Sequence, residues 1–233
     1  MTSDFVTVDF PSTRFTMSFN AYARQFVLSL IVLSTLAWTA KAQTVVIDPG
    51  HGGTERVNGS SPNNAKGPKG TLEKDLTLDV ALKTAEVLRE QGIEVIMTRD
   101  KDVNLGLADR ALVAKNAKAD AFLSIHFNGW KTPDVQGTET FRHENASDDS
   151  NSEQLAKRVL AAVLKVTGYK NRGVKTARFG VLNPQHHDDK TAACLLEISF
   201  MTDPKDEARL ADEKYRQQLA EAIAGAVAEH VKK

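Results

Sequence analysis

Apolar runs of two kinds alternate along residues 44–231 of the chain. Short runs rich in β-branched residues are typical of buried strands, whereas apolar positions that recur every three or four residues are typical of helices packed on a core. The short runs predict strands at Thr44–Ile47, Ile93–Thr98, Ala121–Phe127, Gly137–Arg142, Arg178–Leu182 and Ala193–Phe200. The periodic segments predict helices at Glu73–Gln91, Leu105–Lys118, Ser152–Thr167, Pro204–Leu210 and Tyr215–Val231.

Strands and helices alternate throughout this region. Such alternation predicts a single α/β domain with a mostly parallel sheet and helices on both faces. Ligands of these sheets bind at the carboxyl ends of the strands. His51 and His126 lie at two predicted strand ends, and the long Gly-, Ser- and Asn-containing loop Gly52–Gly70 follows His51. A long loop in a compact domain is often functional, so this edge of the sheet is the expected site.

The first 42 residues have the pattern of a signal peptide. Arg24 precedes the apolar segment Phe26–Trp38, and Ala40-Lys41-Ala42 provides a small-x-small cleavage site before Gln43. The apolar stretch is shorter than the ~20 residues that cross a bilayer as a helix, although an uncleaved anchor is the alternative. Acidic residues before Met17 are unusual in a signal peptide, so Met17 is a possible start. We expect a secreted or periplasmic protein, free of the membrane after cleavage, with residues 43–233 as its functional domain.

Composition narrows the function classes. The 233-residue chain has 30 basic and 30 acidic residues and a formal net charge of zero, so it lacks the basic field typical of nucleic-acid binding. Its one cysteine, Cys194, excludes an intramolecular disulfide and a Cys-rich zinc module. The sequence therefore favours neither nucleic acid as a partner nor a disulfide-stabilised scaffold.

Four residues in distinctive contexts carry the candidate chemistry. His51 follows Val45-Val46-Ile47-Asp48-Pro49-Gly50, Glu73 opens a predicted helix, and His126 and Glu197 lie in apolar strands. Two histidines and one glutamate are a recurring ligand set for catalytic zinc, which keeps a fourth position for water. A carboxylate beside that water can move its proton, and Glu197 suits this role. Taken singly, His51 is better explained as a turn residue that caps backbone groups, and Glu73 as a first-turn helix residue that interacts with the helix dipole.

The same segments resemble the zinc-dependent N-acetylmuramoyl-L-alanine amidases of the amidase-3 family. The resemblance rests on Val45–Gly53, Leu72–Leu76, Ser124–Asn128 and Leu196–Phe200, and it covers roughly Val45 to Val231. It implies a single α/β domain with a six-stranded sheet and cleavage of the amide between the lactyl group of N-acetylmuramic acid and L-alanine in peptidoglycan. It also implies Zn²⁺ as cofactor, with His51, Glu73 and His126 as metal ligands and Glu197 as the catalytic acid and base.

Several expectations stay open at this point. Ser199 stands where the family usually has glycine, and we expect a local backbone adjustment there. No segment is long enough for a helix that plugs the site, so an accessible site is expected. A zinc peptidase of another specificity and a non-enzymatic wall-binding module are the alternative functions. Peptidoglycan is the expected partner, and the sequence does not identify a protein activator.

Minor candidates are weighed in the same way. His186 and His187 are expected in a solvated loop. Arg99 is expected to form an ion pair with a neighbouring aspartate, with binding of a substrate carboxylate as the alternative. Asp48 and Asn128 flank the candidate ligands and are possible partners that orient the imidazoles.

Overall fold

The computed structural model describes residues 5–10, 13–18 and 43–233. The predicted signal segment Phe26–Trp38 lies outside these residues. Within the described part of the N-terminal unit, β1 (Phe5–Phe10) and β2 (Thr13–Ser18) pair as antiparallel strands, which the sequence pattern did not predict. None of the helices in the described ranges combines the length and the apolar character needed to cross a membrane.

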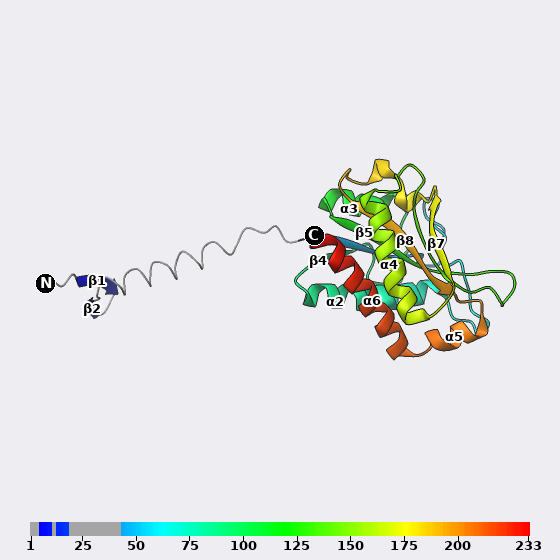
Figure 1. Ribbon diagram of the computed structural model, residues 1–233, viewed down its shortest axis with the longest axis horizontal. Helices are drawn as coiled ribbons and strands as arrows, with labels where there is room; N and C mark the ends of the chain where they lie inside the picture. Colours follow the sequence, from blue (N-terminus) through cyan, green and yellow to red (C-terminus); the bar gives the residue numbers. More distant parts are fainter. Residues whose placement is uncertain (1–4, 11–12, 19–42) are drawn as a thin grey trace. The chain divides into compact units, whose positions relative to one another are not determined.

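The second unit is built on a six-stranded sheet with the strand order β4-β3-β5-β8-β6-β7 (Figure 1). All neighbouring pairs are parallel except β8 and β6, which are antiparallel. The strands are β3 (Thr44–Pro49), β4 (Glu94–Met97), β5 (Ala121–Asn128), β6 (Thr138–His143), β7 (Asn171–Ala177) and β8 (Ala192–Phe200). The predicted mostly parallel sheet is confirmed.

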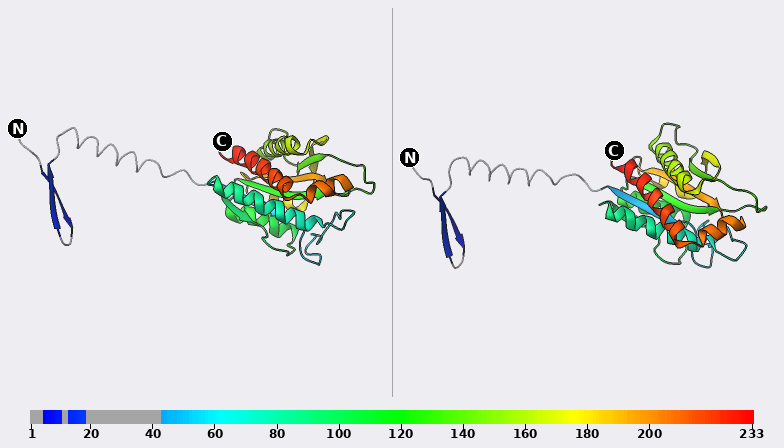
Figure 2. Two further views of the ribbon diagram at one scale, coloured as in Figure 1. Left: turned by 90° about the horizontal axis from the view of Figure 1, so that it is seen from below. Right: turned by 60° about the horizontal axis from the view of Figure 1, so that its bottom comes forward.

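Helices cover both faces of this sheet, as predicted (Figure 2). The helices are α2 (Glu73–Glu90), α3 (Leu107–Ala117), α4 (Asn151–Thr167), α5 (Pro204–Leu210) and α6 (Glu213–Val231). Helices α2, α4 and α6 pack on one face through a large apolar cluster that includes Leu123 and Leu196. Helix α3 and the one-turn 3-10 helix η1 (Gly180–Leu182) cover the other face around Phe122.

One predicted strand was wrong. Residues 178–182 do not form a strand; instead Val181 and Leu182 are buried within η1, and the edge strand β7 lies earlier, at Asn171–Ala177. The reason is that β7 pairs on one side only and carries mostly polar, half-buried residues, so it lacks the apolar run of a buried strand. The apolar pair that suggested a strand is explained by packing under α3.

The carboxyl ends of β3, β5 and β8 meet at one edge of the sheet. His126 on β5 lies directly opposite Glu197 on β8, and the register then shifts so that Asn128 pairs with Phe200. Strand β8 therefore has one extra residue, within Ile198–Ser199, relative to β5. Bulges of this kind re-aim side chains beside functional sites, and this one lies where a backbone adjustment was expected at Ser199.

Candidate active site

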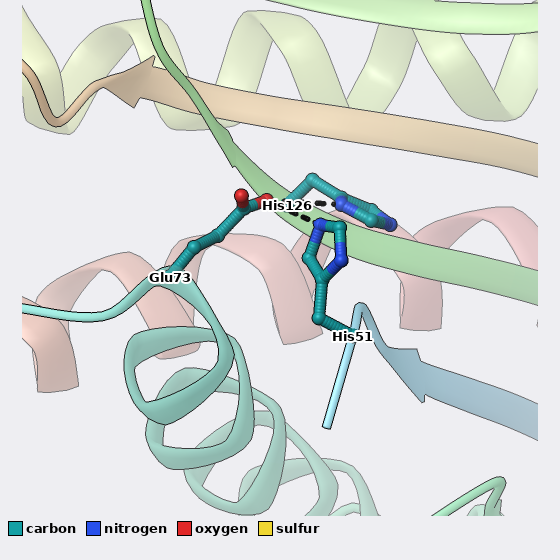
Figure 3. A group of neighbouring side chains, drawn as sticks. All are labelled: His51, Glu73 and His126. Atoms are coloured by element: carbon teal, nitrogen blue, oxygen red, sulfur yellow. Dashed lines mark hydrogen bonds and ion pairs between the residues drawn. The ribbon is translucent and has the colours of Figure 1, made fainter. Parts of the chain in front are cut away.

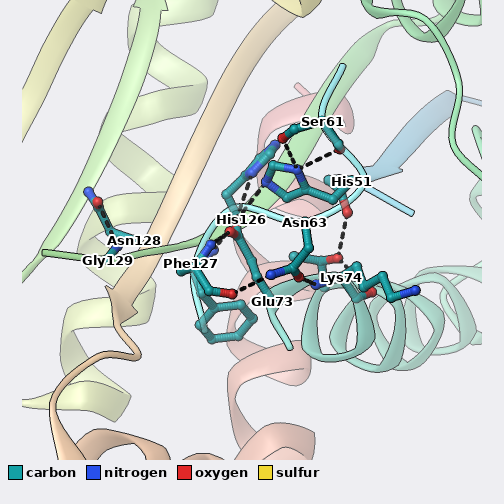
Figure 4. A network of polar contacts seen from close by, with 12 residues as sticks. His51, Ser61, Asn63, Glu73, Lys74, His126, Phe127, Asn128 and Gly129 are labelled. Carbon is teal, nitrogen blue, oxygen red and sulfur yellow. Dashed lines mark hydrogen bonds and ion pairs between the residues drawn. The ribbon is translucent and has the colours of Figure 1, made fainter. Parts of the chain in front are cut away.

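His51 is held in an unusual backbone conformation just after β3. Its φ of +62° is in the left-handed region, which non-glycine residues seldom occupy outside strained or functional positions. Its Nδ1 donates to the carbonyl oxygen of Ser61 at 3.0 Å, and this contact directs Nε2 toward Glu73, as the nitrogen available to a metal ion. The loop Gly52–Gly70 thus fixes the tautomer and the direction of the imidazole (Figure 4).

Two buried arginines hold the turn that carries His51. Arg110 donates to the carbonyl oxygens of Pro49 at 2.8 Å and His51 at 2.7 Å. Arg99 donates to those of Pro49 at 3.0 Å and Gly50 at 2.9 Å. The carbonyl oxygens of Pro49, Gly50 and His51 thus all accept hydrogen bonds from a guanidinium group. These bonds fix the backbone conformation of the turn and of His51. The expected ion pair of Arg99 with a neighbouring aspartate is therefore not formed among the described residues: Arg99 is buried and binds the backbone of the turn.

Asp48 anchors this arrangement from within β3. It is fully buried, and it accepts hydrogen bonds from Arg110 at 2.9 Å, Thr98 at 2.5 Å and Ser124 at 2.6 Å. Burial alone raises the pKa of Asp48, but the charge of Arg110 and these hydrogen bonds bring it below its usual value. Asp48 therefore positions the turn that carries His51 through Arg110, and it makes no hydrogen bond to an imidazole among the described residues.

Glu73 is the first residue of α2 and is almost completely buried. Its Oε2 accepts from the backbone N–H of Ala65 at 2.8 Å, and its Oε1 accepts from that of Phe127 at 3.2 Å. Burial raises the pKa of Glu73, but hydrogen bonds and charge from His126 and His51 outweigh it and lower the pKa to about 2. Glu73 is therefore a fixed carboxylate at neutral pH.

His126 completes the group from β5. Its Nδ1 lies 3.1 Å from Oε1 of Glu73, and its ring meets that of His51 edge-on with centroids 4.9 Å apart. The ring packs so closely over Gly50 that a Cβ there would lie 2.2 Å from its Cε1. Glycine at position 50 is thus required by the position of His126.

The three side chains converge from a turn, a helix start and a strand (Figure 3). Their donor atoms all lie within 4.8 Å of one another, and Nε2 of His51 is 3.1 Å from Oε1 of Glu73. Bonds from zinc to these ligands are about 2.0–2.2 Å long, so two ligands of one tetrahedral ion lie roughly 3.3 Å apart. The spacing and chemistry of this set therefore fit a zinc ion.

Glu197 lies beside the group on β8. Its backbone is in register with His126 on one side and with Glu139 of β6 on the other. Its Oε2 is buried and makes no hydrogen bond within the part of the chain that the structure describes. Burial, followed by the negative charges of Glu73 and Glu139, raises the pKa of Glu197 well above its usual value. An unpartnered acid with a high proton affinity suits proton transfer.

A cavity of about 290 Å³ opens over these groups. His51 and His126 keep 10% and 15% of their side-chain surface exposed. The walls include His51, His126, Glu197, Leu107, Phe179 and Val181. Among the described residues, the pocket is lined by loops, strand ends, the start of α3 and the one-turn η1, in agreement with the expected accessible site.

Two minor predictions were wrong. His187 is only 5% exposed; its Nε2 donates to the carbonyl of Val181 at 2.7 Å, so it is a structural residue and not part of a solvated loop. Asn128 does not orient an imidazole; its amide donates to Glu139 at 2.9 Å. Sequence reasoning overlooked Glu139, an acidic residue two positions before Phe141 in a predicted strand. The structure buries it, and buried acidic residues are rare unless they are paired.

Comparison with known proteins gives a consistent result. A family model described as N-acetylmuramoyl-L-alanine amidase matches residues 45–229. The N-acetylmuramoyl-L-alanine amidase LytC of Bacillus subtilis is 33% identical over 181 residues, which cover 78% of this chain and 34% of LytC. The probable cell wall amidase LytH of Staphylococcus epidermidis is 32% identical over 183 residues, which cover 78% of this chain and 56% of LytH. The chain thus spans between about a third and just over half of these relatives.

The fold has a close counterpart among solved structures. The amidase AmiC2 of Nostoc punctiforme aligns with a TM-score of 0.71 and 34% identity, over 84% of this chain and 100% of that one. The matched segment of the family model contains all four residues singled out from the sequence, and the six-stranded sheet agrees with the fold that the resemblance implied. The chain belongs to the N-acetylmuramoyl-L-alanine amidase family, amidase-3.

Proposed function

We propose that the protein is a zinc-dependent amidase that cleaves the bond between the lactyl group of N-acetylmuramic acid and L-alanine in peptidoglycan. The observation that carries the proposal is the convergence of His51, Glu73 and His126 within 4.8 Å, with Glu197 in register beside them. Family membership supports the substrate class. LytC and LytH are named as a muramoyl-alanine amidase and a probable cell wall amidase.

In the proposed site, His51 Nε2, His126 Nδ1 and Glu73 Oε1 would hold the zinc ion. A bound zinc ion supplies a water whose pKa is about 7 and polarises the carbonyl of the scissile amide. The hydrogen bond from His51 Nδ1 to Ser61 directs Nε2 toward the site, where it can bind the ion, and the two backbone N–H groups on Glu73 fix its carboxylate. The chain thereby holds its ligand atoms in place before the ion arrives.

Glu197 would move the proton. Its carboxyl group accepts a proton from the attacking water and then donates it to the nitrogen of the leaving L-alanine. The absence of a hydrogen-bond partner on Oε2 among the described residues leaves this oxygen available for the transfer.

The proposed setting is outside the cytoplasmic membrane. Residues 1–42 are proposed as a signal peptide that exports residues 43–233 as the catalytic domain, to the periplasm or the cell exterior. The relative LytH is named a probable cell wall amidase, which supports action at the wall.

The proposal predicts metal-dependent release of peptides from muramyl-peptide strands. A chelator should abolish the release, and zinc added in excess of the chelator should restore it, because the three ligands hold the ion reversibly. The products are separated by chromatography and identified by mass. New amino termini at L-alanine support the proposal, whereas cleavage within the peptide, with the lactyl amide intact, indicates a zinc peptidase of another specificity.

A further inference from the structure

A row of charged residues continues from the candidate metal site across the sheet. His126, Glu197 and Glu139 are successive register neighbours on β5, β8 and β6. Register partners share a face of the sheet, so Glu139 faces the same side as Glu197. On β7, the next strand, Arg172 and Lys175 reach the same carboxylate. Because neighbouring strands lie about 4.8 Å apart, the backbone of β7 is roughly 10 Å from that of β8. The two cationic groups reach back from β7 to Glu139 on β6, the strand between them.

Two cations share one buried carboxylate in this row. Oε2 of Glu139 accepts from Arg172 Nε at 2.6 Å and from Lys175 Nζ at 2.5 Å, while Oε1 accepts from Asn128. Glu139 is 4% exposed, but the side chains of Arg172 and Lys175 are 28% and 37% exposed. The cluster of Glu139, Arg172 and Lys175 therefore carries two positive charges and one negative charge. Both positive side chains are more exposed than the carboxylate that they share.

Arg172 is held firmly in place, but not all of its guanidinium N–H groups donate hydrogen bonds within the described residues. Its guanidinium lies 4.8 Å from the ring centroid of Phe200, and its aliphatic stem passes over Gly137, where a Cβ would lie 2.4 Å from its Cδ. Only its Nε donates a hydrogen bond within the described ranges, which leaves both terminal nitrogens without a protein acceptor there. Arg110 and Arg99 differ, because all three nitrogens of each donate to acceptors in the fold.

We propose that Arg172, assisted by Lys175, binds a carboxylate of the substrate's peptide and so determines specificity. The two free guanidinium nitrogens match a carboxylate in a bidentate pair. An extended peptide advances about 3.3–3.6 Å per residue, so cations between one and two strand spacings from Glu197, roughly 5–10 Å, are within reach of the second or third residue beyond the cleaved amide. In muramyl peptides the second residue is a glutamate joined through its side chain, whose α-carboxyl group is either free or amidated. This inference rests on the proposed amidase function.

The test compares two muramyl peptides that differ only in a free or an amidated glutamate α-carboxyl group. The zinc-loaded protein is expected to prefer the free carboxylate by roughly 10- to 100-fold in kcat/KM, the range for a hydrogen-bonded charge pair. Arg172→Gln should reduce this preference to about one, chiefly by raising KM for the free acid. Arg178→Gln is the matched control, because that exposed arginine pairs with Glu144 and not with the cluster; it should keep the preference.

Lys175→Gln is the second variant if Arg172→Gln unfolds, and it should weaken the same preference. Calorimetric binding of the two peptides to the Glu197→Gln protein gives a readout that does not require turnover. The inference is overturned if the parent protein hydrolyses both peptides equally, or if both cluster variants keep the full preference. Hydrolysis of neither peptide by the zinc-loaded parent protein would instead overturn the proposed function itself, and this inference with it.

Discussion

Glu197→Gln is expected to lower kcat by roughly 10²- to 10⁴-fold, the contribution typical of a general acid and base. The amide has nearly the same shape as the carboxyl group but cannot accept and return a proton. Because Glu197 is not one of the three converging donors, the variant should keep its zinc and its fold. Rates on muramyl-peptide strands, zinc content and thermal unfolding are measured on the same preparation.

Glu221→Gln is the matched control, since Glu221 is an exposed residue of α6 whose carboxylate contacts only Gln217 among the described residues. It should behave like the parent protein. Turnover by Glu197→Gln within about tenfold of the parent would remove Glu197 from the proton-transfer role. Loss of zinc from this variant would instead make Glu197 a ligand, contrary to the proposed site.

Asp48→Asn is expected to destabilise the protein by about 3–5 kcal/mol, because it leaves the charge of Arg110 buried without its partner. Arg110 also donates to the carbonyl oxygen of His51, so the variant should loosen the turn that presents this ligand and weaken zinc binding. Denaturant unfolding at neutral pH measures the first effect. Asp134→Asn, a change at an exposed loop residue, is the control and should leave the unfolding free energy nearly unchanged.

The pH dependence of this effect follows from the lowered pKa of Asp48. The unfolded chain, in which an aspartate has a pKa of about 3.9, takes up this proton at higher pH than the folded protein does. The contribution of Asp48 to the unfolding free energy is therefore complete at pH values above the unfolded-state pKa. It is lost as the pH falls through the lower pKa of Asp48 in the folded protein. The difference in unfolding free energy between parent and Asp48→Asn should be constant near neutral pH and shrink in acid. A difference that grows in acid would contradict this account.

The apolar pattern predicted most of the fold because buried elements repeat their hydrophobic positions. The runs at Val45–Ile47 and Ala121–Phe127 are central strands buried on both faces, and their composition reflects this directly. The edge strand β7 has no such composition, because its stability comes from pairing with β6 on one side. Its position follows only from the assembled sheet.

The candidate site was predictable where residue type and local context together restrict the chemistry. His51, Glu73, His126 and Glu197 stand in distinctive motifs, and the structure brings them to one edge of the sheet. The contacts of the groups that support them were not predictable, because these contacts span up to 76 residues, between Asp48 and Ser124. Charged residues such as Arg99 and Arg172 look alike in the sequence. Only the acceptors around each guanidinium distinguish a buried structural arginine from one with free nitrogens.

The central claim is that His51, Glu73 and His126 together hold one zinc ion. The most direct test is zinc titration of chelator-stripped protein, with bound metal counted by atomic emission, for the parent, His126→Ala and Glu197→Gln. The account predicts one tightly bound zinc per chain in the parent and in Glu197→Gln, and none retained by His126→Ala after gel filtration. Retention of a full equivalent of zinc by His126→Ala, or no binding by the parent, would contradict it.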